Sequence, residues 1–189
     1  MQVREQEVIW REVMDEASFE LALIVTGPGG VEITGTVLMA EDGVPLRVDY
    51  AIQCSENWST RRVEVLQSYS GDVRALRLDH DGAGNWTRDG DEAPDLKGCT
   101  DVDISVSPST NALPMNRLGL KVGDSGEIKA AWVRFPSLEV IVAGQGYERL
   151  GDRLYRFSNL DDDFRAVIEV DDLGVPIDYA DIWQRIAKR

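Results

Sequence analysis

The sequence predicts an all-β protein with a large antiparallel sheet or open barrel of about ten or more strands and one or two short helices. The first observation is an alternation of side chains with a period of two along nearly the whole chain, which is typical of strands. The second is the clusters of glycine, aspartate, serine and proline between the alternating runs, which are typical of hairpin turns. The third is the length of 189 residues, which suits one all-β domain over residues 1–189.

The first predicted hairpin shows how the strands are recognised. Residues 19–26 alternate, Gly27-Pro28-Gly29-Gly30 makes a turn, and residues 31–39 continue as a second strand. Ser70-Gly71-Asp72 marks another hairpin in the same way. Together these signals predict strands over residues 19–26, 31–39, 46–52, 61–69, 73–79, 101–107, 127–135, 138–150, 153–157 and 164–171, with a short strand around Trp86.

Helical patterns are confined to two places in the chain. In residues 179–189, Ile182, Trp183 and Ile186 are spaced for one apolar helix face, so we expect a helix at the end of the chain. A second short helix is expected after Thr110-Asn111, where the asparagine can cap the first turn.

Residues 98–118 combine a strand, a turn between two prolines and an arginine. Val102, Ile104 and Val106 fall on one face of this strand, and the opposite face carries Asp101, Asp103, Ser105 and Ser107. We expect an edge strand with its apolar face inward and its polar face outward. It should end at Pro108, because proline cannot donate a hydrogen bond to a sheet.

The Asp101/Asp103 pair is the best catalytic candidate in the sequence. Two carboxylates on one face of a strand lie roughly 6.5–7 Å apart at their Cα atoms. Such a pair could serve glycoside hydrolysis or bind a divalent cation. The same carboxylates could instead form structural ion pairs with Arg61, Arg62 or Arg117, and we favour this interpretation because structural ion pairs are the commoner cause of perturbed carboxylates.

The net charge of −14 and the pI near 4.4 argue against partners that require basic patches, namely nucleic acids and anionic membrane surfaces. The N-terminal residues are charged throughout, without the apolar centre of a signal peptide. No apolar run is long enough for stable insertion into a bilayer. We therefore expect a soluble cytoplasmic protein.

Cys54 and Cys99 do not make a disulfide framework and are expected to be buried thiols.

Histidine chemistry is scarce, because His80 is the only histidine. It lies in an acidic turn and is expected at the surface, where no serine is positioned to use it as a base. Metal sites made from histidine and cysteine are excluded by the count. Residues 79–90 look like a calcium loop only superficially, since Ala83 and Gly90 stand where ligands are required. We expect no metal and no cofactor.

Several motifs resemble those of a bacterial family. They are Trp58-Ser59-Thr60-Arg61, residues 98–105, residues 107–118, Gln145-Gly146-Tyr147, and Val170-Asp171-Asp172-Leu173-Gly174 followed by Tyr179. The chain is identified by them as a member of the putative glycolipid-binding family. Two positions depart from the family pattern: Ser109 replaces an aromatic residue, and Met115-Asn116 replaces Ile-Arg.

The resemblance implies an antiparallel β half-barrel, similar to the periplasmic carriers of lipoproteins, and a non-catalytic protein that binds a glycolipid or another lipid-like small molecule. Arg61 and Arg117 would hold an anionic or sugar headgroup, and Asp101 and Asp103 would accept from hydroxyls or fix the arginines. The full expected ligand-binding set is Trp58, Arg61, Asp101, Asp103, Asn111, Arg117, Gln145 and Tyr147.

Two other functions stay open at this point. One is an enzyme that hydrolyses a sugar or an ester through Asp101 and Asp103. The other is a structural or interaction protein in which Asn111 and Arg117 satisfy buried backbone groups. An open half-barrel also leaves strand edges that a second copy could cover, so a homodimer is among the expected partners.

Overall fold

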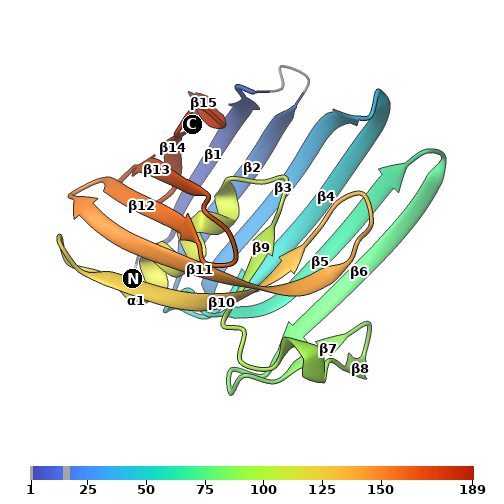
Figure 1. The fold of residues 1–189 in the computed structure, drawn as a ribbon, viewed down its shortest axis with the longest axis horizontal. Helices are drawn as coiled ribbons and strands as arrows, with labels where there is room; N and C mark the ends of the chain where they lie inside the picture. Colours follow the sequence, from blue (N-terminus) through green and yellow to red (C-terminus); the bar gives the residue numbers. More distant parts are fainter. Residues whose placement is uncertain (1, 15–17) are drawn as a thin grey trace.

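The computed structural model describes residues 2–14 and 18–189, and these residues form one sheet of fifteen strands (Figure 1). The predicted all-β fold is confirmed. The strands are β1 (Arg4–Glu12), β2 (Phe19–Gly27), β3 (Gly30–Glu41), β4 (Val44–Cys54), β5 (Thr60–Tyr69), β6 (Asp72–His80), β7 (Trp86–Arg88), β8 (Asp91–Glu92), β9 (Asp101–Ile104), β10 (Ser125–Val133), β11 (Val140–Gly151), β12 (Leu154–Asn159), β13 (Arg165–Val170), β14 (Pro176–Tyr179) and β15 (Trp183–Lys188). The helices are η1 (Pro94–Leu96), η2 (Ser109–Asn111) and α1 (Ala112–Leu118).

The sheet follows the chain almost strand by strand. Its order is β8-β7-β6-β5-β4-β3-β2-β1-β15-β14-β13-β12-β11-β10-β9, so the first and last strands pair in its middle. Neighbouring strands are antiparallel except β9 and β10, which are parallel. The sheet curves without closing, and β8 and β9 are its edges. In Figure 1, β1–β6 form one wall and β10–β13 a facing wall, with η2 and α1 between them.

The concave side of the sheet holds the core. On β2, Glu20, Ala22 and Ile24 point inward and are buried, whereas Phe19 and Leu21 lie exposed on the convex side. Helix α1 adds the buried Leu113 and Met115 to the same core. The helical segment thus fills much of the hollow that a curved sheet would otherwise leave open.

The predicted helix over residues 179–189 is wrong. This part of the chain forms β14, a turn and β15, and β15 pairs with β1 through register partners such as Glu12 and Trp183. An isolated helix of this length is marginal in water, and a place in the middle of a sheet satisfies the backbone along the whole segment. Strand β1 was not predicted either, because the surrounding charges obscure its alternating buried residues Gln6, Val8 and Trp10.

The expected orientation of residues 101–107 is wrong in part. β9 is an edge strand, as predicted, but it ends at Ile104, and Asp101 is fully buried together with Val102. The polar face is covered because η2 and α1 fold back over it, so Arg117 reaches Asp101. The predicted short helix is confirmed, although Asn111 makes no capping bond through its side chain. Its helical backbone angles place it inside the helical run instead.

His80 is not a surface residue as expected. It ends β6, is 8% exposed, and stacks on Trp86 with 4.6 Å between the ring centroids. One ring nitrogen lies 2.9 Å from the Thr60 carbonyl, and the other accepts from the Gly84 amide. The hairpin of β6 and β7 encloses the ring, which the local sequence does not reveal. Cys54 and Cys99 are buried free thiols, as predicted.

Candidate functional site

A cavity of about 220 Å³ opens on the concave side, between the β9–η2 segment, strands β10–β12 and the β14–β15 turn. Its polar wall comes mainly from Asp103, Ser105, Ser107, Asn111 and Gln145. An aromatic wall is formed by Trp132, Phe157, Phe164, Tyr179 and Trp183. Ala143, Asn159 and Ile182 complete the lining. Apolar walls with a few convergent polar groups are typical of sites for small ligands.

Asp103 is the ionisable carboxyl group of the cavity. Its Oδ2 accepts a hydrogen bond of 2.6 Å from Gln145 Nε2, and Thr110 donates to Oδ1 at 3.3 Å. Burial raises the pKa of this carboxyl to about 6, against the lowering effect of these two hydrogen bonds. Asp103 is therefore ionised at neutral pH and gains a proton in mildly acidic solution.

A chain of hydrogen bonds ties the polar wall together. Tyr147 donates from its hydroxyl towards Gln145 Oε1 at 3.2 Å and Asn111 Oδ1 at 3.1 Å. Asn111 in turn donates from Nδ2 to the Pro108 carbonyl. Gln145 is thereby oriented with its amide nitrogen towards Asp103. The polar wall is preorganised, because each of these groups is held by the next.

The aromatic wall is organised around Phe157. Tyr147 and Tyr179 approach this ring edge-on, with centroids at 5.5 and 6.2 Å, and Phe164 lies tilted at 6.0 Å. Such arrangements add to the energy of burial alone. Phe164 is 42% exposed, so it lies at the rim of the cavity. The wall therefore offers apolar aromatic surface to a ligand and reaches the solvent at Phe164.

A second polar cluster lies behind the cavity. Glu20 is fully buried and accepts from Tyr50 and from Ser107, whose Oγ is 2.8 Å away and which also lines the cavity. Ser109 Oγ lies 2.6 Å from the Tyr50 hydroxyl. Burial raises the pKa of Glu20 to about 7. Gly35 makes room for the cluster, because a Cβ there would overlap the Tyr50 ring.

Asp101 and Arg117 form an ion pair apart from the cavity lining. Arg117 donates to Asp101 through Nε at 3.0 Å and Nη2 at 2.7 Å, and Thr100 donates to the same carboxylate. The Asp101 side chain is 1% exposed and that of Arg117 is 18% exposed. A bidentate pair of this kind holds both groups in place.

Trp58 and Arg61 also lie elsewhere. Trp58 belongs to the turn between β4 and β5 and does not line this cavity. Arg61 lines a separate cavity of about 810 Å³ beside the β6–β7 hairpin, together with Arg62, His80 and Lys97. The structure thus brings Asp103, Asn111, Gln145 and Tyr147 together and sets Trp58, Arg61, Asp101 and Arg117 apart from them.

Neither Glu20 nor the aromatic wall was predicted from the sequence. Glu20 could have been suspected, because it occupies an inward position in the otherwise apolar run of β2. The aromatic side chains come from β10, β12, the β12–β13 loop, β14 and β15, and no local pattern connects them.

Within residues 2–14 and 18–189, no group of three His, Cys, Asp or Glu side chains could hold a metal. No described helix has the length and apolar character required to cross a membrane.

Comparisons with known proteins agree on one family. The model of the putative glycolipid-binding family matches residues 7–185. The fold is similar to the crystal structure of a DUF1089 family protein from Pseudomonas aeruginosa, with a TM-score of 0.83 and 33% sequence identity. That similarity covers 90% of this chain and 92% of the other. No curated protein matches the sequence.

Proposed function

We propose that this chain, which belongs to the putative glycolipid-binding family, is a non-catalytic binding protein that holds the polar head of a glycolipid or a similar amphipathic ligand in the concave cavity. The observation that carries the proposal is the pairing of a polar wall, centred on Asp103 and Gln145, with an aromatic wall centred on Phe157. Aromatic faces pack against the apolar face of a sugar ring, and polar side chains bind its hydroxyls.

The size of the cavity limits what it can hold. A volume of about 220 Å³ lies below the roughly 300–1,000 Å³ that is usual for pockets that enclose a drug-sized ligand. This is room for a headgroup and not for acyl chains as well. The tail would leave past Phe164, which lines the cavity and is 42% exposed.

The two carboxylates of β9 support binding over hydrolysis. Hydrolysis of a glycosidic bond requires a pair of carboxyl groups that flank the bond. Here Asp101 is held by Arg117 and Thr100, and of the two only Asp103 lines the cavity. One carboxylate fixed by neighbouring amide and hydroxyl donors is suited to accepting hydrogen bonds from a bound head.

The proposal is tested by native mass spectrometry of the purified protein, followed by addition of octyl β-glucoside. Ala143→Phe places a large side chain in the cavity, and Val142→Phe adds the same side chain on the exposed face of β11. We expect an adduct with the wild type and with Val142→Phe, and its loss in Ala143→Phe. Overpacking of this kind typically costs about 1–3 kcal/mol, so a thermal melt establishes that the variant is folded. An equal adduct in folded Ala143→Phe would contradict the proposed site.

A further inference from the structure

The lining of the concave cavity has an unusual charge balance. Asp103 is an acidic residue, and none of the lining side chains within the described residues is lysine, arginine or histidine. The nearby cations are occupied elsewhere: Arg117 is paired with Asp101, and Arg134 lies near Glu139 and over the Trp132 ring. A head that enters the cavity therefore meets a negative field.

Asp103 is able to receive a further donor. An ionised carboxylate offers about four acceptor positions, and Gln145 and Thr110 occupy two of them. Both partners are neutral, so the charge of Asp103 is not compensated. The other titratable groups that face it are Tyr147 on β11 and Tyr179 on β14, whose pKa values are both raised, and Asp101, which Arg117 neutralises. Glu20 on β2 reaches the cavity only through Ser107.

The aromatic wall, like Asp103, attracts cations. The faces of tryptophan, tyrosine and phenylalanine carry negative electrostatic potential and attract cations within about 6 Å of the ring centroid. Trp132 already accepts such a contact, because the Arg134 guanidinium lies 5.3 Å from its ring centroid. Tyr179 and Trp183 line the same cavity as Asp103.

We propose that the cavity selects a positively charged, amine-bearing headgroup and rejects anionic headgroups, with Asp103 as the residue that determines this specificity. The inference rests on the proposed function and deepens it. It differs from the expectation that Arg61 and Arg117 hold an anionic head, because neither guanidinium lines this cavity. An ammonium group would donate to Asp103 and pack against the rings, whereas a carboxylate or sulfate would find no cation there.

The test uses three octyl glycosides with the same ring and tail: the glucoside, the 2-amino-2-deoxyglucoside and the glucuronide. Their dissociation constants are measured by calorimetry at pH 7, below the concentrations at which they form micelles. We expect the amino sugar to bind at least about tenfold more tightly than the glucoside, as a charged hydrogen bond and cation–π contacts imply. The glucuronide should bind most weakly. At pH 5, where Asp103 is largely protonated, the preference for the amine should shrink.

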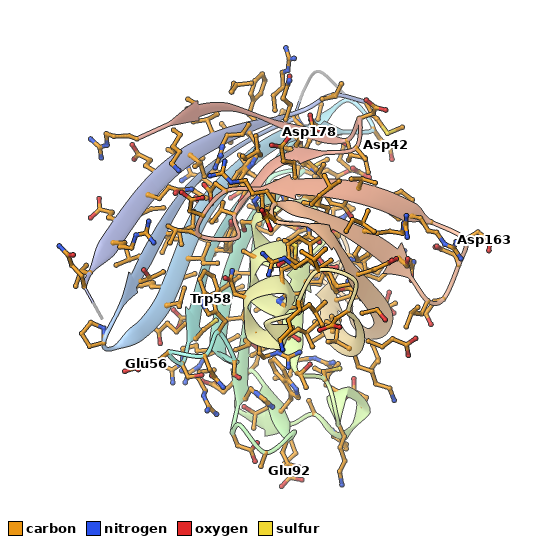
Figure 2. All side chains as sticks on the ribbon, turned by 90° about the vertical axis from the view of Figure 1, so that its left-hand side faces the viewer. Asp42, Glu56, Trp58, Glu92, Asp163 and Asp178 are labelled. Carbon is orange, nitrogen blue, oxygen red and sulfur yellow. The ribbon has the colours of Figure 1, made fainter. Side chains whose placement is uncertain are left out.

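Variants separate the role of Asp103 from general effects of charge. Asp103→Asn should abolish the preference for the amino sugar over the glucoside while weakening the binding of both, whereas Asp103→Glu should retain part of that preference. Asp163→Asn makes the same change of charge on the exposed β12–β13 loop, and Asp163 points away from the molecule in Figure 2. This control should keep the wild-type order.

Each result has a definite meaning. Equal affinity for the amino sugar and the glucoside would overturn the charge selectivity and leave the proposed function in place. Tightest binding of the glucuronide would also overturn it. Failure of all three glycosides to bind the wild type would instead count against the proposed function itself.

Discussion

The ion pair between Asp101 and Arg117 provides the most informative stability test. Arg117→Leu removes the two charged hydrogen bonds, of 3.0 and 2.7 Å, that the Asp101 carboxylate receives. The Asp101 side chain is 1% exposed, so water cannot replace the lost donors. Thr100 would be left as its partner, at 2.8 Å.

The magnitude follows from burial and hydrogen bonding. Breaking a buried ion pair on one side typically costs about 3–5 kcal/mol, and two hydrogen bonds to charged groups give a similar sum. Arg117 is 18% exposed, which favours the lower end, about 3 kcal/mol. With a urea m-value of about 2 kcal/mol/M, the denaturation midpoint should fall by about 1.5 M.

Two further variants serve as controls for the loss of stability in Arg117→Leu. Arg153→Leu breaks the ion pair between Arg153 and Asp172, whose side chains are 54% and 71% exposed respectively. This variant should lose less than about 1 kcal/mol of unfolding free energy. Asp101→Leu combined with Arg117→Leu leaves no unpaired buried charge and should recover much of the loss. If Arg117→Leu costs no more than Arg153→Leu, the buried-pair argument is refuted, and Arg117 is again a candidate for holding a ligand.

Two other predictions concern the cluster behind the cavity. Burial raises the pKa of Glu20 from 4.5 to about 7, so the folded protein holds this proton more tightly than the unfolded chain. The stability that this group contributes is present below about pH 4.5 and falls by about 3 kcal/mol as the pH rises to about 7. Glu20→Gln should abolish this fall, as measured by urea titrations across that pH range. Identical pH profiles of the wild type and the variant would contradict this assignment. Gly35→Ala should cost about 1–3 kcal/mol because its methyl group would overlap Tyr50, whereas Gly29→Ala, with open space around it, should change the melting temperature little. Equal effects at the two glycines would show that the overlap is relieved.

Most of the sheet could be predicted because hairpins are local. The turn at Gly27-Pro28-Gly29-Gly30 lies between the two runs that it joins, and β2 and β3 pair from Gly27 and Gly30 outward. The alternation of buried side chains is likewise visible within a few residues. The failures occurred where a partner was remote: β1 and β15 stabilise each other from opposite ends of the chain, so neither had a local signal strong enough to identify it.

Some residues of the candidate site were predictable, but their arrangement in space was not. Asp103, Asn111, Gln145 and Tyr147 were expected from the resemblance, but their contacts join positions 42 and 36 residues apart. Nothing near Arg61 or Arg117 in the sequence indicates which of them is paired. The curvature of the sheet decides this, since it carries β9 and α1 across the hollow towards β11.

By itself, the sequence determined the all-β class, the family resemblance and most of the strands, because period-two alternation and turn residues act over a few neighbouring positions. The tertiary structure alone decided that α1 fills the hollow, that Asp101 is paired while Asp103 faces a cavity, and that the aromatic side chains meet in one wall. The physical reason is that burial and charge pairing depend on which strands the curved sheet brings face to face, and those distances are not encoded in any single segment.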